Sequence, residues 1–166
     1  WANLTIGAYS VYPADSSTTC YGNCTDIYGN LYNAYAVDDN RGICPAGWHV
    51  PNDAKWTILT DYLGGLDVAG GKMKESEYEH WAYVFDELTE ETTNESGFTG
   101  LPGGGRDGNN DGINGYLLIE NSGYFWSTTD FDSSQRYCRA LYYYQSSVEH
   151  SYVQKPMGLS IRCLKD

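Results

Sequence analysis

The sequence predicts a single domain of mixed helix and strand, on the basis of its size, one amphipathic helix and three strand-like segments near its C-terminus. The chain has 166 residues, a length that suits one domain with a substantial hydrophobic core. Hydrophobic residues make up 41% and charged residues 19%, a balance typical of folded chains rather than disordered ones. We therefore expect residues 1–166 to form one domain, with residues 1–27 as an N-terminal strand and loop extension.

The helix is the clearest local prediction. Asn52 is suited to cap its N-terminus, and Asp53 suits the positive end of the helix dipole. The apolar residues that recur at helical spacing lie on one face: Trp56, Leu59 and Leu63. The glycine pair at 64–65 ends the helix.

The remaining segments differ in composition. Residues 74–95 carry many acids, which favours a solvated face or loop. Residues 97–115 are rich in glycine, which favours irregular backbone. Aromatic and β-branched residues predict strands in three later segments, 123–127, 137–144 and 159–164.

Charge and composition limit the partners. The net charge of −12 repels phosphate, so nucleic acid and anionic membranes are poor partners. No apolar run approaches the roughly 20 residues of a membrane span, so we expect no direct membrane insertion. Five cysteines, many tyrosines and glycines and only two methionines favour an exported, extracytoplasmic protein over a cytosolic enzyme. No signal-peptide pattern is visible at Trp1, so we expect any export signal to lie outside this segment.

One short segment has the spacing of a calcium loop. Asp107, Asn109 and Asp111 alternate and precede a glycine, an arrangement that wraps oxygen ligands around a hard cation. The twelfth position of an EF-hand would be Leu118, which excludes that motif. We expect either one structural Ca²⁺ held by Asp107, Asn109, Asp111 and Glu120, or a turn that needs no ion.

No catalytic pattern is present. The three histidines, His49, His80 and His150, lack the spacing of a zinc site, and no serine or cysteine nucleophile motif occurs. We therefore expect the chain not to be an enzyme. Cys20 and Cys24 are suited to chelate a metal, to form a redox pair or to close a small disulfide loop, and the disulfide is our prediction.

Several motifs in order carry a resemblance to a known family. They are Leu31–Val37, Gly42-Ile-Cys-Pro-Ala-Gly-Trp-His-Val-Pro51, Asp53–Trp56, Leu63–Gly65, Ala69–Lys72, Asn94–Phe98, Leu101–Gly104, Gly123-Tyr-Phe-Trp-Ser-Thr-Thr129 and Ser160–Cys163. Over residues 28–166 the chain resembles the Fibrobacter succinogenes major paralogous domain family of bacterial exported proteins. The resemblance implies an α+β, C-type-lectin-like fold, with one or two helices packed on small twisted antiparallel sheets and long ordered loops.

The resemblance also implies a disulfide. Cys44 would pair with Cys163 and close a loop of about 119 residues. With Cys20 and Cys24 as the second pair, Cys138 would remain a free thiol. The tripeptides with which sugar-binding C-type lectins hold calcium are absent, so we do not expect calcium-dependent sugar binding of that type.

Within the family, the C-terminal region resembles the variable region of proteins diversified by retroelements. Its tyrosines and serines are also the residues of antibody paratopes. If Leu141 and Val148 face the core, alternation places Ala140, Tyr142 and Tyr144 outward beside Cys138. The full set of expected ligand-binding residues is Phe131, Asp132, Gln135, Tyr137, Cys138, Ala140, Tyr142, Tyr144, Gln145, Ser147, Glu149, His150 and Tyr152.

These observations predict a non-enzymatic, extracytoplasmic ligand-binding domain of display or adhesin type. Its C-terminal surface, within residues 123–166, would bind a protein, a glycan or another surface ligand. Two alternatives remain: a structural module of a bacterial cell-surface assembly and a calcium-independent carbohydrate-binding domain. The sequence does not fix the oligomeric state.

Overall fold

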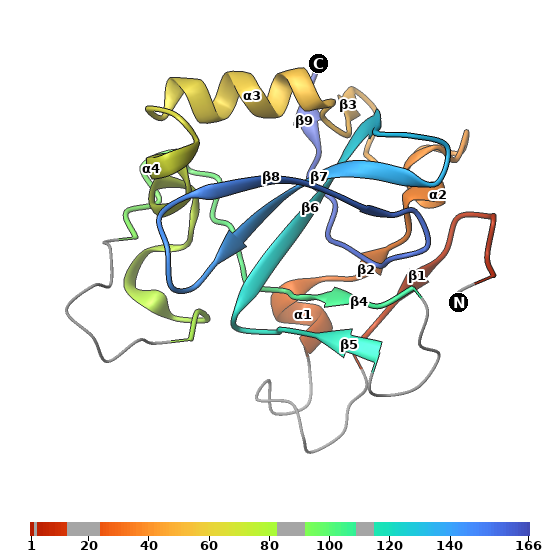
Figure 1. Ribbon diagram of the computed structural model, residues 1–166, viewed down its shortest axis with the longest axis horizontal. Coiled ribbons are helices and arrows are strands. Elements are labelled where there is room, and N and C mark those ends of the chain that lie inside the picture. Colours follow the sequence, from red (N-terminus) through yellow and green to blue (C-terminus); the bar gives the residue numbers. More distant parts are fainter. Residues whose placement is uncertain (2, 13–23, 83–91, 109–114) are drawn as a thin grey trace.

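The computed structural model describes residues 1, 3–12, 24–82, 92–108 and 115–166 (Figure 1). Helices and antiparallel strands are mixed along these residues, which confirms the predicted α+β class. The helices are α1 Cys24–Tyr28, α2 Ala34–Val37, α3 Asp53–Tyr62 and α4 Leu66–Met73, and a 3₁₀ turn follows at Ser76–Tyr78. None of the helices in the described part of the chain is long and apolar enough to cross a membrane.

The strands form several small antiparallel sheets. Three are two-stranded: β1 Tyr9–Ser10 with β2 Leu31–Tyr32, β3 Trp48–His49 with β9 Leu164–Lys165, and β4 Gly105–Arg106 with β5 Tyr116–Leu117. The fourth is a three-stranded sheet in the order β6 Ser122–Asp130, β7 Gln135–Tyr142 and β8 Val148–Gln154. Within the predicted extension 1–27, the strand β1 occupies only residues 9–10, and Ile6 is exposed.

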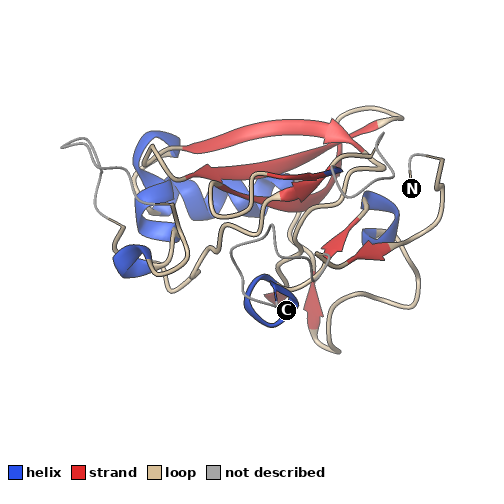
Figure 2. Cartoon of the chain, turned by 90° about the horizontal axis from the view of Figure 1, so that it is seen from below, coloured by secondary structure: helices blue, strands red, loops and turns tan. Residues whose placement is uncertain are grey.

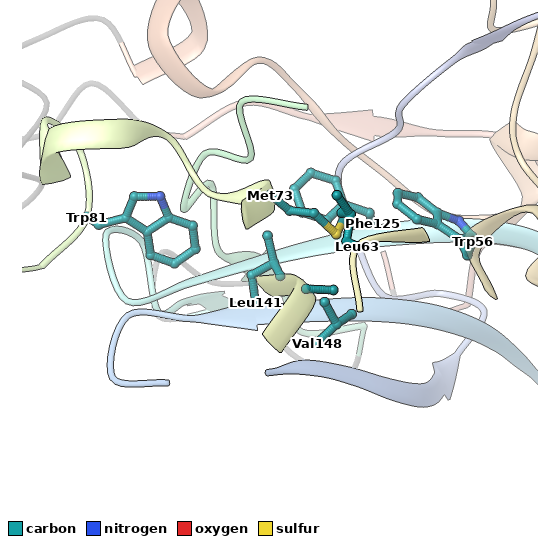
Figure 3. Packing of buried hydrophobic residues seen from close by; sticks show 8 residues of the cluster. Trp56, Leu63, Met73, Trp81, Phe125, Leu141 and Val148 are labelled. Carbon is teal, nitrogen blue, oxygen red and sulfur yellow. The ribbon is translucent and has the colours of Figure 1, made fainter. Parts of the chain in front are cut away.

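The three-stranded sheet is the middle layer of the domain. One of its faces packs against α3 and α4, where Leu141 and Val148 join Trp56, Leu63 and Met73 in the largest core cluster (Figure 3). Its other face carries Trp126 and Cys138, which pack against Ala34 of α2 and Leu159. Figure 2 shows the long strands of this sheet beside the helices. Both faces of the sheet are therefore covered over much of their length.

Helix α3 confirms the sequence prediction at its start and at its buried face. The Asn52 side chain accepts a hydrogen bond from the backbone N–H of Lys55 at 2.9 Å. Trp56 and Leu63 are buried, and Leu59 packs against the same cluster. The indole N–H of Trp56 donates to the carbonyl of Trp126 at 3.3 Å, which joins the helix to β6.

Helix α4 was not expected, because glycines disfavour helix. Its sequence includes Gly70 and Gly71, which are both buried. A Cβ added at Gly70 would lie 2.5 Å from the carbonyl oxygen of Ser147 and 2.6 Å from that of Ser146. The missing side chain lets the helix approach the turn between β7 and β8, and the backbone N–H of Gly71 donates to Ser146 at 3.1 Å.

The disulfide between Cys44 and Cys163 is confirmed. Their Cα atoms lie 5.8 Å apart, and the bond spans a separation of 119 residues. It joins the segment before β3 to the segment before β9, and these two strands pair with each other. Cys24 is buried and disulfide-bonded, while Cys20, its predicted partner, lies outside the described residues.

The acidic segment 74–95 does not begin as a solvated loop. Lys74 is buried, and its ammonium group donates to the carbonyls of Tyr142 at 2.7 Å and Gln145 at 2.6 Å. Trp81 is buried as well, and its indole N–H donates to Gly100 at 3.0 Å. Apolar and backbone contacts thus anchor both ends of segment 74–81, while residues 83–91 lie outside the described residues.

Candidate functional site: an exposed aromatic cluster

The side chains of β7 that face α3 pass from the core to solvent along the strand. Leu141 is fully buried in the core, and Arg139 lies under the first turn of α3 with 1% of its surface exposed. Tyr137, two residues further, is only half-buried. On β8 the residues paired with these three follow the same gradient, from buried Val148 to exposed His150 and Tyr152. The sheet therefore extends past the helix and leaves part of this face uncovered.

Four aromatic side chains occupy the uncovered part, and we call them the aromatic cluster: Phe131, Tyr137, His150 and Tyr152. The rings of Phe131 and Tyr152 stack with centroids 3.8 Å apart and an interplanar angle of 1°. Tyr137 meets Phe131 edge-on at 5.5 Å and lies 4.9 Å from His150. Phe131 and Tyr152 nevertheless remain 44% and 45% exposed. All four residues belong to the predicted ligand-binding set.

A charged network connects the cluster to α3. The carboxylate of Asp53 accepts from Arg139 at 2.6 Å and lies 3.0 Å from Nε2 of His150. Arg139 also donates to the hydroxyl of Thr57 at 3.2 Å. Asp53 and Arg139 were absent from the predicted site, although the acid was recognised as a first-turn helix residue. Only the pairing of β7 with β8 brings Arg139 opposite His150, and no sequence signal reports that pairing.

The turn that carries Phe131 is fixed by ion pairs and hydrogen bonds. Asp130 accepts from Arg136 at 2.7 Å and from Lys155 at 2.8 Å. Burial raises the pKa of the Asp130 carboxyl, but these two cations outweigh burial and leave the pKa below its usual value. The next acid, Asp132, accepts from the backbone and hydroxyl of Ser134, which lowers its pKa. Two carboxylates thus flank the exposed ring of Phe131 at neutral pH.

Three other predicted residues lie on the opposite face of the sheet. Tyr142 and Glu149 are on the side of Cys138 and Ala140, as the strand register requires. There Tyr142 stacks on Tyr144 at 5.6 Å and meets Tyr124 edge-on at 6.0 Å. Burial, then hydrogen bonding with Tyr124, raises the pKa of Tyr142. The expectation of one shared surface is therefore wrong, because alternation sends Tyr137 and Tyr142 to opposite sides.

Two predicted residues are not at the surface at all. Cys138 and Ala140 are buried, with exposures of 0% and 1%. Outward alternation was expected to expose them, but α2 and the segment around Leu159 cover this face. Of the remaining predicted residues, Gln135 is the first residue of β7, beside the aromatic cluster, and Gln145 and Ser147 lie in the turn packed on α4.

The thiol of Cys138 is free, as expected, but it is inaccessible. Burial raises its pKa to about 12, against the opposing effect of Arg139. Because the thiolate is the reactive form, we expect iodoacetamide not to modify Cys138 in the native protein at neutral or mildly alkaline pH. Mass spectrometry should find alkylation only after denaturation, and rapid labelling of the native protein would contradict this burial.

The predicted calcium residues are only partly described. Asn109 and Asp111 lie outside the described residues. The backbone N–H of Asp107 donates to Gly115 at 2.6 Å, and the carbonyl of Glu120 accepts from Ala82 at 2.8 Å. The calcium loop stays a prediction.

Comparison with known proteins gives one result. No curated protein and no solved structure matches the chain significantly. The family model of the Fibrobacter succinogenes major domain matches residues 7–165. This range includes the three-stranded sheet, α3 and the aromatic cluster. The chain belongs to the Fibrobacter succinogenes major domain family.

Proposed function

We propose that this chain is a non-enzymatic, extracytoplasmic ligand-binding domain with a C-type-lectin-like scaffold, and that the aromatic cluster is its binding surface. The observation that carries the proposal is the exposure of stacked aromatic rings at a point where the sheet continues beyond its covering helix. The rings of Phe131 and Tyr152 face solvent although a helix could have covered them. Exposed aromatic surfaces of this kind commonly bind partners.

The chemistry of the cluster suits recognition of a protein or glycan surface. Tyrosine offers a large apolar ring with a polar tip and loses little conformational entropy on binding. Phe131 and Tyr152 are already stacked, so their side chains would lose less conformational entropy when a ligand binds. His150, Asp53 and Asp132 provide hydrogen-bonding groups around the rings. A neutral or cationic ligand is favoured, since the net charge is −12.

Two further observations support the location and the mode of use. A disulfide between distant segments is typical of proteins outside the reducing cytosol. The resemblance of the C-terminal region to retroelement-diversified proteins implies a fixed scaffold with changeable surface residues. The scaffold contacts here, such as Arg139 with Asp53, lie directly beneath the exposed residues.

The proposal predicts that the aromatic cluster contributes little to folding. We expect Phe131→Ser/Tyr152→Ser to change the free energy of unfolding by less than about 1.5 kcal/mol, since both rings are half-exposed. The control Leu141→Ala, from the same face of the sheet, should cost about 2–5 kcal/mol. Urea denaturation measures both variants. If the double variant lowered the free energy of unfolding as much as Leu141→Ala does, the cluster would be part of the core. That result would contradict the proposal.

The carbohydrate alternative has its own test. On a glycan array, binding by the wild type that is lost in Phe131→Ser/Tyr152→Ser would identify a glycan as the ligand of this surface. Glycan binding that the double variant retains would place the binding site elsewhere and contradict the proposal.

A further inference from the structure

A second group of functional side chains lies far from the aromatic cluster, where the acidic segment follows α4. Glu75, Glu79 and His80 each direct one ligand atom to the same place, and these atoms lie within 4.8 Å of one another. Both oxygens of Glu75 lie near Nδ1 of His80, at 2.9 and 3.0 Å. Imidazole nitrogen and carboxylate oxygen are both donors that zinc accepts, and the imidazole favours zinc over calcium or magnesium.

Two of these three side chains are already held in place. The backbone N–H of Glu75 donates to Gly100 at 3.2 Å, and Trp81, next to His80, donates to the same carbonyl at 3.0 Å. The backbone N–H of His80 donates to Glu75 at 3.2 Å, and Tyr28 meets the imidazole ring edge-on at 5.8 Å. Glu75 is only 13% exposed in its side chain. The side chains of Glu75 and His80 would therefore lose little conformational entropy on binding a metal ion.

Negative charge gathers at this point. No lysine or arginine in the described ranges forms an ion pair with Glu75 or Glu79. The cluster thus has an excess of acid that a divalent cation would neutralise.

We propose that Glu75, Glu79 and His80 bind one zinc ion. In a tetrahedral shell with bonds of about 2.0–2.2 Å, ligand atoms lie about 3.3–3.6 Å apart, slightly more than the 2.9–3.0 Å between the carboxylate oxygens of Glu75 and Nδ1 of His80. The exposed Glu79 side chain closes the remaining distance by rotation. On binding, Nδ1 of His80 donates its lone pair to the metal, and the neutral imidazole carries its proton on Nε2. Three protein ligands leave the fourth position to water.

Isothermal titration of the chelator-treated full chain with Zn²⁺ tests the site. We expect one saturable site in the wild type, weakened at least about 100-fold in both His80→Gln and Glu75→Gln. His49→Gln is the matched control, because His49 also contacts a carboxylate, that of Asp166, without a third ligand in the described residues. This variant should bind Zn²⁺ like the wild type.

Thermal unfolding without metal checks that each variant is folded, and only folded variants are compared. If His80→Gln fails to fold, Glu79→Gln, at an exposed position, serves as the second variant. No saturable binding by the wild type, or equal affinity in the wild type and the folded variants, would overturn the proposal. Displacement of zinc by an excess of Ca²⁺ would overturn it too, because an imidazole ligand disfavours calcium.

Discussion

Replacing both Cys44 and Cys163 with alanine should lower the free energy of unfolding by about 2–5 kcal/mol. The bond closes a loop of 119 residues, so its loss frees most of the unfolded chain. For a domain of this size, such a loss lowers the melting temperature by roughly 5–20 °C. Calorimetry of the oxidised wild type and the double variant measures the difference.

The double variant is preferable to chemical reduction, because a reductant would also reach the disulfide of Cys24. The double variant also creates no new free thiol in addition to that of Cys138. A melting temperature equal to that of the wild type would mean that the pairing of β3 with β9 holds the C-terminal segment without the covalent bond.

A second large effect is expected at the ion pair beneath the aromatic cluster. Asp53→Ala removes the carboxylate that accepts from Arg139 at 2.6 Å. The guanidinium would stay buried, and within the part of the chain that the structure describes its Nε has no hydrogen-bond partner even in the wild type. Leaving a buried charge unpaired costs about 3–5 kcal/mol. Urea denaturation measures the loss.

The double variant Asp53→Ala/Arg139→Met separates the charge from the packing. It removes the stranded guanidinium, so it should recover much of the stability that Asp53→Ala loses. A cost below about 1 kcal/mol for Asp53→Ala would contradict the account, because the remaining bonds of Arg139 to Thr57 and Cys138 would then suffice.

Local sequence rules predicted the elements whose residues agree with them. Asn52 and the apolar face of α3 gave the helix and its start, and β-favouring residues gave much of β6 and β7. Helix α4 was missed because glycine has a low helix propensity. Gly70 is present because the helix packs closely against the β7–β8 turn, a tertiary contact that leaves no room for a side chain. Strand β8 was missed because its residues, from Val148 to Gln154, are mostly polar and four of the seven are exposed.

The candidate site was predicted only in part, because local sequence patterns do not report tertiary contacts. Composition identified the region, and four of its residues form one cluster. Alternation was applied with Leu141 and Val148 assumed to face the core, and both do lie there. It could not show that the other face is covered by Ala34 and Leu159, which come from distant parts of the chain. For that reason Cys138 and Ala140 were expected at the surface.

We propose that exposed side chains of the C-terminal region vary while the scaffold beneath them stays fixed. The DNA flanking the gene tests it directly, through a search for a repeat of the segment encoding Gly123 to Cys163 in which differences fall at adenines. Tyrosine, histidine, phenylalanine, aspartate and serine are all encoded by triplets that differ from an asparagine triplet only where that triplet has adenine.

We predict that such a repeat exists and that its differences fall in the codons of the aromatic cluster, namely exposed Phe131, His150 and Tyr152 and half-buried Tyr137. The codons of the buried residues Arg139 and Leu141 should match. Absence of a repeat, or differences concentrated in buried codons, would contradict diversification and favour a structural module of a cell-surface assembly.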